Sequence, residues 1–126
     1  MTRFTGHAPF LVVPDVATTL DHYRDVLGFE VATYEHDPEE NGTATRDDCT
    51  IFFNRGPEAK PNSELVPPDL FDVYVWVEDV DSLHAELQGH GAELLHGPVE
   101  RPWGMREIRV RDPNGYVLGF GEPLGS

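Results

Sequence analysis

The sequence predicts an α+β fold made of two tandem β-α-β-β-β modules, and two observations support this. First, the two halves of the chain echo one another: an Asp-Val pair, a helical apolar pattern and a glycine occur from Asp15 and again from Asp79. Second, short segments with a β pattern precede and follow each helical segment. A repeat of half the length of a 126-residue chain indicates a duplicated structural unit.

The first module is expected at about residues 7–54. It opens with the β pattern HAPFLVV, and a helix begins after Asp15, whose side chain can accept the unpaired N–H groups of a helix start. Apolar residues then recur at helical spacing as far as Leu27. Gly28 suits the left-handed position that ends a helix. Strands are predicted in FEVATYEH and CTIFFN, joined by a loop with the sequence DPEENGTATRDD.

The second module is expected at about residues 70–122, after a linker of about residues 55–69 that contains four prolines. The strand LFDVYVWV leads into a helix capped by Asp79 and ended by Gly91. Three strands follow, in AELLHG, MREIRVRD and YVLGFGE. The last two are joined by Asp-Pro-Asn-Gly, which is typical of a turn because proline presets φ and glycine tolerates positive φ. We expect both modules to form one domain.

The composition argues against several classes of function. Nine basic and 23 acidic residues give a net charge of −14, which disfavours nucleic acid and anionic membranes and favours cationic ligands. No apolar run approaches the ~20 residues of a membrane span. The start of the chain lacks the apolar region of a secretory signal, and Cys49 is the only cysteine. We therefore expect a cytoplasmic protein without an intrachain disulfide.

Several stretches carry a resemblance to a known family. Two modules with DVATTLDHYRDVLGFEV in the first and RDPNGY near the end resemble the vicinal oxygen chelate superfamily, which includes glyoxalase I, extradiol dioxygenases, fosfomycin-resistance enzymes and bleomycin-resistance proteins. The resemblance covers roughly residues 8–122 and implies a curved mixed sheet with a concave groove. APFLVVPDV, RDDCTIFF and RPWGMREIRVRDPNGYVLGF are similar to the bleomycin-resistance proteins, which bind a drug without altering it.

This resemblance also implies a partner. In bleomycin-resistance proteins two subunits complete the groove, and the first-strand arms exchange between them. Pro9 matches the hinge-like proline of that arm. A homodimer is the assembly expected from the resemblance, with or without exchange of the N-terminal strands.

The metal-dependent enzymes of the superfamily carry histidines on the first strand and on the strand that opens the second half, and a glutamate on the last strand. The corresponding positions here are Ala8, Asp72 and Gly119. A transition-metal site needs about three or four protein ligands, and Asp72 alone cannot supply them. The six histidines are scattered over helix faces and strand ends. We therefore expect no cofactor, no metal site and no catalytic residue.

Aromatic residues are expected to line the groove instead. Strand alternation puts Asp72, Tyr74 and Trp76 on one face and the intervening valines on the other. Trp103 lies in a Pro-Trp-Gly loop at the groove mouth, where an indole can stack on planar rings or cations. Ordinary packing is the alternative role for these rings. The candidate ligand-binding residues are Tyr34, Phe52, Asp72, Tyr74, Trp76, Trp103 and Glu107, with Phe52 or Phe53 facing the groove.

These observations favour a dimeric protein that sequesters a large natural product with planar aromatic groups, either bleomycin-type or another flat antibiotic. One alternative is a metal-dependent glyoxalase-type lyase or dioxygenase. Another is a metal-free isomerase with Asp72 or Glu107 as its base, and a third is a small-ligand sensor or carrier. The sequence leaves the identity of the ligand open.

Overall fold

The computed structural model describes residues 1–33, 39–66 and 70–125 and confirms the predicted fold class. Module one contains β1 (Phe10–Val13), α1 (Val16–Asp25), β2 (Glu30–Thr33), β3 (Asn41–Arg46) and β4 (Cys49–Arg55). A short 3-10 helix, η1 (Asn62–Glu64), lies in the linker. Module two contains β5 (Val73–Trp76), α2 (Val80–Gly89), β6 (Glu93–Arg101), β7 (Met105–Arg111) and β8 (Val117–Pro123).

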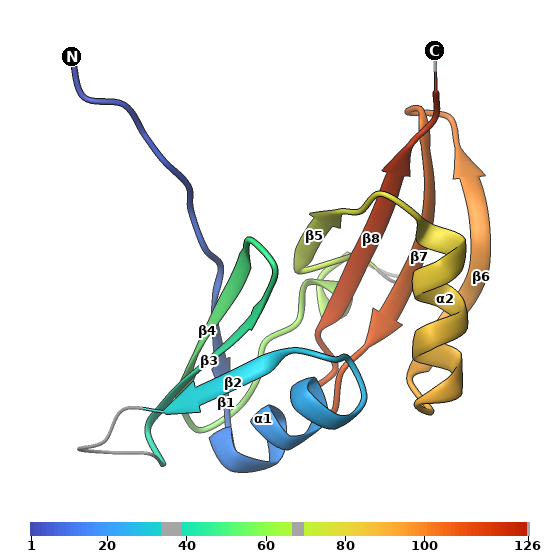
Figure 1. Ribbon diagram of the computed structural model, residues 1–126. Coiled ribbons are helices and arrows are strands. Elements are labelled where there is room, and N and C mark those ends of the chain that lie inside the picture. The colour runs from blue at the N-terminus through green and yellow to red at the C-terminus, as the bar shows by residue number, and fades with distance from the viewer. Residues whose placement is uncertain (34–38, 67–69, 126) are drawn as a thin grey trace.

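Each module forms a four-stranded mixed sheet with one helix beside it (Figure 1). The strand orders are β1-β4-β3-β2 and β5-β8-β7-β6. In each sheet the first strand pairs in parallel with the last, and the other neighbours are antiparallel. The two sheets therefore have the same topology, as expected for a duplicated unit.

The aspartate caps and the glycines predicted at the helix ends are present in the structure. The Asp15 and Asp79 side chains each accept a backbone hydrogen bond at 3.0 Å, from Thr18 and Ser82 respectively. After the helices, Gly28 has φ 77° and Gly91 has φ 78°. Residues with a Cβ rarely adopt this conformation, so the glycines allow the chain to turn back toward the sheet.

One segment was predicted wrongly. The structure places β3 (Asn41–Arg46) inside the stretch that the sequence predicts as a loop. Its residues are mostly polar and show no clear strand pattern, but it pairs with both β2 and β4. Ala44 is fully buried, and a Cβ on Gly42 would lie 2.7 Å from Leu20 Cδ1. Small residues are therefore needed where α1 packs closely on this strand.

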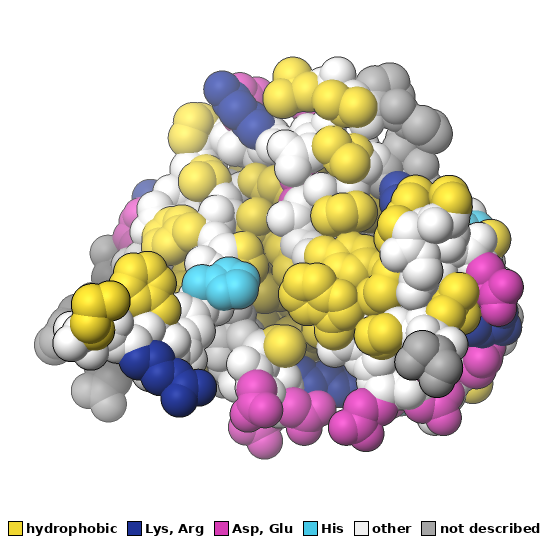
Figure 2. All heavy atoms as spheres, turned by 90° about the horizontal axis from the view of Figure 1, so that it is seen from above, with side chains coloured by type: hydrophobic (Ala, Val, Ile, Leu, Met, Phe, Trp, Pro, Cys, Tyr) yellow, Lys and Arg dark blue, Asp and Glu magenta, His cyan; other side chains and the backbone are white. Residues whose placement is uncertain are grey.

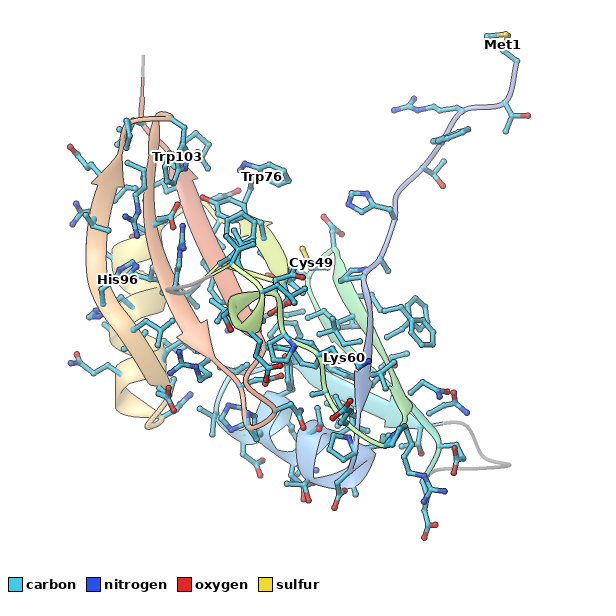
Figure 3. The ribbon with its side chains drawn as sticks, turned by 180° about the vertical axis from the view of Figure 1, so that it is seen from behind. Met1, Cys49, Lys60, Trp76, His96 and Trp103 are labelled. Carbon is cyan, nitrogen blue, oxygen red and sulfur yellow. The ribbon has the colours of Figure 1, made fainter. Side chains whose placement is uncertain are left out.

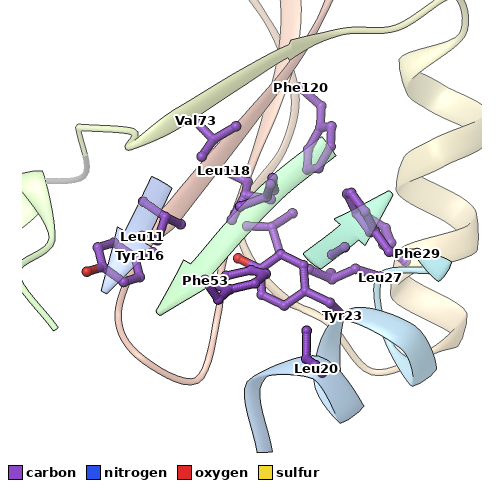
Figure 4. Close-up of a cluster of buried hydrophobic side chains, with 14 of the residues drawn as sticks. Leu11, Leu20, Tyr23, Leu27, Phe29, Phe53, Val73, Tyr116, Leu118 and Phe120 are labelled. Atoms are coloured by element: carbon purple, nitrogen blue, oxygen red, sulfur yellow. The ribbon is translucent and has the colours of Figure 1, made fainter. Parts of the chain in front are cut away.

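A single hydrophobic core joins the two modules (Figure 4). Tyr23 of α1 lies edge-on to Phe53 of β4, with ring centroids 4.9 Å apart, and near Phe29 at 5.6 Å. Leu118 and Phe120 of β8 belong to the same cluster. Because residues from both sheets fill one core, each module fixes the position of the other.

Polar contacts reinforce this junction. The buried Tyr23 hydroxyl donates to Asp112 Oδ2 at 2.8 Å, linking α1 to the turn between β7 and β8. The other oxygen of Asp112 accepts from the backbone N–H groups of Asn114 and Tyr116. Burial raises the pKa of the Asp112 carboxyl, and burial together with the Asp112 charge raises the pKa of the Tyr23 hydroxyl well above its ordinary value. The tyrosine therefore remains a hydrogen-bond donor.

The N-terminal residues extend away from the body of the protein (Figures 1 and 3). Phe4 is 93% exposed there. β1 begins after this arm and pairs with β4 of the same chain, and the Pro9 carbonyl accepts from Phe52 N at 3.0 Å. Exchange of the arm with a partner remains a prediction.

Within the described residues, neither helix has the length and apolar character needed to cross a membrane.

The Tyr23–Asp112 contact gives a stability prediction. Tyr23→Phe should lower the free energy of unfolding by about 1–3 kcal/mol, because it leaves a buried carboxylate oxygen without its donor. Tyr74→Phe is a matched control, since the hydroxyl of this partly exposed tyrosine makes a longer bond of 3.3 Å. Urea unfolding would compare the two variants. Equal midpoints for Tyr23→Phe and the unmodified chain would contradict the assigned role.

Candidate functional site

Module two has an open pocket on the sheet face opposite the shared core. Val73 and Val75 of β5 contact the core, whereas Tyr74 and Trp76 point the other way. The pocket has a volume of about 690 Å³. Its lining residues, which we call the aromatic pocket, are Leu70, Phe71, Tyr74, Trp76, Trp103, Met105 and Arg109.

The rings of this pocket form a contiguous group. The Tyr74 centroid lies 4.9 Å from that of Phe71 and 5.7 Å from that of Trp76. Trp76 is 67% exposed and Trp103 is 57% exposed. Both tryptophans lie toward the same end of the molecule (Figure 3), and hydrophobic side chains gather across the middle of the face seen from above (Figure 2). Large exposed rings of this kind are typical of binding surfaces.

Trp103 occupies the tight connection between β6 and β7. The following glycine, Gly104, has φ 85° and donates its N–H to the Arg101 carbonyl at 3.1 Å. The Arg101 guanidinium carbon lies 5.7 Å from the centroid of the Trp103 ring, a cation–π arrangement. The loop thus holds the indole at the rim of the pocket, where a ligand can reach it.

A buried carboxylate supports the aromatic pocket from below. Glu107 is fully buried, accepts from Arg109 Nε at 2.8 Å and lies 3.6 Å from Arg101 Nε. The Tyr74 hydroxyl donates to its other oxygen at 3.3 Å. Burial, and then the charge of Glu107, raise the pKa of Tyr74, which keeps this hydroxyl protonated. Glu107 therefore orients the pocket residues and is shielded from a ligand.

Two of the three positions that correspond to the metal ligands of the superfamily, Asp72 and Gly119, serve structural roles. The two oxygens of Asp72 accept from Asn62 N at 2.7 Å and Val117 N at 2.9 Å. A Cβ on Gly119 would lie 2.8 Å from Tyr74 Cδ1, so the tyrosine ring fills the space that a side chain would need. Across the described ranges, no three His, Cys, Asp or Glu side chains come together as a metal site would require.

The other predicted site residues lie elsewhere. Phe52 points away from the core, in contrast to the buried Phe53, and its ring lies 6.1 Å from that of Phe10 in a stacked arrangement. Asp72 borders a separate hollow of about 490 Å³ beside Phe10. Tyr34 lies outside the described residues. The aromatic pocket therefore unites Tyr74, Trp76 and Trp103 but neither Phe52 nor Asp72.

Sequence reasoning missed four pocket residues: Leu70, Phe71, Met105 and Arg109. Alternation along β7 provided a signal for two of them, because Met105 and Arg109 share the parity of Glu107. Phe71 precedes β5, where alternation no longer predicts direction. Its ring packs on Tyr74 and also lies 5.3 Å from the Arg109 guanidinium carbon.

Comparison with known proteins identifies relatives that match most of the chain. The family model described as Glyoxalase/Bleomycin resistance protein/Dioxygenase superfamily matches residues 5–120. Virulence protein STM3117 of Salmonella typhimurium is 25% identical over 119 residues, covering 86% of this chain and 76% of that protein. Anthracycline biosynthesis protein DnrV of Streptomyces peucetius is 28% identical over 133 residues, covering 94% of this chain but only 48% of that protein. The chain thus spans about half the length of DnrV.

Solved structures give the same architecture. The bleomycin-binding protein from bleomycin-producing Streptomyces verticillus, complexed with copper(II)-bleomycin, matches with a TM-score of 0.70 and 26% identity, covering 100% of both chains. A glyoxalase-related enzyme from Clostridium phytofermentans matches with a TM-score of 0.74 over 98% of each chain. At 17% identity, the latter likeness shows the fold alone.

The role assigned to Glu107 can be tested by stability. Glu107→Gln should lower the free energy of unfolding by about 3 kcal/mol, because it breaks a buried ion pair. Glu93→Gln is the matched control: its carboxylate pairs with Arg111 at 2.7 Å but is 59% exposed, so a loss of about 0–1 kcal/mol is expected. Denaturant unfolding of both variants is the measurement. Losses of equal size would argue against a buried clamp at Glu107.

Proposed function

Because the chain belongs to the Glyoxalase/Bleomycin resistance protein/Dioxygenase superfamily, whose fold serves many chemistries, we propose its function from the site itself. The protein binds a large natural product with planar aromatic groups, bleomycin-type or another flat antibiotic, and sequesters it in the cytoplasm without chemical change. The observation that carries this proposal is the aromatic pocket, with Trp76 and Trp103 exposed at its edge. Indole rings stack on flat heteroaromatic groups with few torsions to freeze.

Similarity to a drug-binding protein supports the same function. The Streptomyces verticillus relative is described as bleomycin-binding and covers the full length of this chain. The net charge of −14 also favours a ligand that carries positive charge outside the pocket. Binding would then protect a cell by mass action, because it lowers the concentration of free drug.

The enzymatic alternatives receive less support from the contacts. An isomerase would need Asp72 or Glu107 as an accessible base. Asp72 already accepts two backbone hydrogen bonds, and Glu107 is fully buried beside two arginines. A lyase or dioxygenase of the superfamily's metal-dependent type would need ligands where Ala8, Asp72 and Gly119 stand. These features favour binding over catalysis.

A homodimer would complete the site. Phe10 is 62% exposed and stacks on Phe52, so the outer face of the first sheet offers apolar surface to a second chain. The exposed tryptophans of module two offer a second such surface. A symmetric dimer would bury both kinds of surface twice and enclose a groove beside each aromatic pocket.

Binding is tested directly with antibiotics and a Trp103 variant. Metal-free bleomycin and daunorubicin would be titrated by calorimetry against the purified protein, after a thermal-shift screen of antibiotics. For an antibiotic that binds the unmodified protein, Trp103→Ala should lower the affinity by about 5- to 150-fold, the range for loss of one stacked ring. The melting temperature should change little, because Trp103 is 57% exposed.

Leu65→Ala is the control for this experiment, since Leu65 is 79% exposed but lies outside the aromatic pocket. Tryptophan fluorescence should also respond to ligand, with Trp76→Phe used to isolate the Trp103 signal. Lost stability with unchanged affinity would make Trp103 a packing residue and remove the main support for drug binding.

Metal independence is a separate expectation. After mild purification, elemental analysis should find well below one equivalent of transition metal per chain. Adding EDTA should leave the dissociation constant for daunorubicin or metal-free bleomycin unchanged. One tightly held equivalent of zinc, nickel or iron in the groove would refute this part of the proposal.

The assembly is tested in solution. Light scattering should give about twice the 14.1 kDa mass of one chain. Phe10→Asp should shift the protein toward a monomer, because it puts a charge on the exposed apolar face, whereas Leu65→Asp in the linker should not. A monomer that retains full affinity for its ligand would show that the second chain is unnecessary.

A further inference from the structure

The Tyr74 ring lies flat against the backbone of β8, at two glycines. In the parallel pairing of β5 with β8, Tyr74 is opposite Gly119 and Trp76 is opposite Gly121. A Cβ built on Gly119 would lie 2.8 Å from Tyr74 Cδ1 and 3.1 Å from Cε1. A Cβ built on Gly121 would clash with the Tyr74 hydroxyl, lie 2.8 Å from Cζ, and also lie 2.9 Å from Met105 Cε, the far end of a flexible side chain. The two glycines therefore sit under opposite ends of one ring.

Neither glycine is explained by backbone conformation. Both lie inside a strand, and neither has the positive φ that favours glycine. Glycine in a strand interior weakens the strand and often marks a close approach by another group. Phe120, which lies between the two glycines, and Leu118, which precedes Gly119, both point into the core. The side of β8 that faces the pocket is thus bare backbone at both positions, and Tyr74 rests on it.

The position of this ring affects the rest of the pocket. Tyr74 contacts Phe71 on one side and Trp76 on the other, and its hydroxyl reaches Glu107. If either glycine carried a side chain, the ring could move only outward, into the open pocket. The floor would then rise by about the thickness of a methyl group, and the contact with Glu107 would lengthen.

We propose that Gly119 and Gly121 are specificity-determining residues of the aromatic pocket. By letting Tyr74 lie flat on β8, they give the pocket the depth to admit a planar, uncharged ring system beside Trp76 and Trp103. We specify an uncharged ring because Arg109, the one charged side chain among the described lining residues, is positive and disfavours a cation, while its Nε is already paired with Glu107; the other lining side chains are aromatic or apolar. This inference rests on the proposed function, since it specifies which part of a ligand enters the pocket.

The test uses Nile red, a flat and uncharged fluorescent dye, as the probe. Gly121→Ala should weaken Nile red binding about 10-fold or more, because the added methyl overpacks the floor. It should also shift the indole N–H resonance of Trp76 in a ¹⁵N-correlated NMR spectrum, since Tyr74 contacts that ring. The loss of affinity should largely disappear in a chain that already carries Tyr74→Ala, because Met105, the other close neighbour of a Cβ at this position, is flexible enough to move aside. Gly119→Ala should behave similarly at the other end of the ring.

Gly97→Ala is the matched control, because Gly97 is also a strand glycine and its Cβ would meet only His84 Nε2, at 4.0 Å. It should leave both the dye affinity and the indole resonance unchanged. An unmodified chain that does not bind Nile red would overturn the inference. So would equal losses from Gly121→Ala with and without Tyr74→Ala.

Folding failure is also informative in this design. If Gly121→Ala fails to fold, Gly119→Ala provides the same comparison. Failure of both variants even in the Tyr74→Ala background would overturn the inference, because a group other than the Tyr74 ring would then occupy the space. The dye and NMR measurements do not depend on any antibiotic. If the dye and NMR results are as expected but no antibiotic binds, this inference stands and the proposed function is refuted.

Discussion

The structure depends on the shared core between the two modules and on the buried Tyr23–Asp112 contact at its edge. Within the described residues each module has four strands and one helix, too little to bury its own sheet face well. Packing Tyr23 and Phe53 of the first module with Leu118 and Phe120 of the second gives both sheets one interior. The hydroxyl of Tyr23 then ties α1 to the turn that leads into β8. This fixes β8, the strand against which Tyr74 of the aromatic pocket rests.

The pocket uses the outer face of elements whose inner face forms the core. On β5, Val73 is buried while Tyr74 and Trp76 line the pocket. Strand alternation makes this division unavoidable, because successive side chains point to opposite faces. The aromatic rings are thus mounted on a strand held in place by the core. A rigid pocket of this kind loses less conformational entropy when a ligand binds.

The acidic charge of the protein is exposed on its surface but paired and buried beneath the pocket. The chain as a whole is strongly acidic, with acidic side chains along one border of the face in Figure 2. At the pocket itself, Glu107 is neutralised by Arg101 and Arg109 and sealed from solvent. In the proposed binding mode, an uncharged ring would enter the pocket while positive groups of the same ligand stay near the acidic surface. Asp72 similarly uses its charge for backbone hydrogen bonds that attach the linker to β8.

The sequence alone determined the duplicated topology, both helix caps and the direction of the β5 side chains, because these follow from local chemistry and strand alternation. It also placed Trp103 in an exposed loop, where the Pro-Trp-Gly stretch has no periodic pattern. It missed β3, whose polar Asn-Gly-Thr-Ala-Thr-Arg stretch becomes a strand through pairing on both sides. Only the tertiary structure decided that Glu107 is sealed beneath the pocket, that Phe52 lies outside it, and that Tyr74 rests on Gly119 and Gly121. These arrangements depend on contacts between residues far apart in the sequence, such as that of Tyr74 with Glu107 and with the two glycines of β8, and no local pattern of residues encodes such contacts.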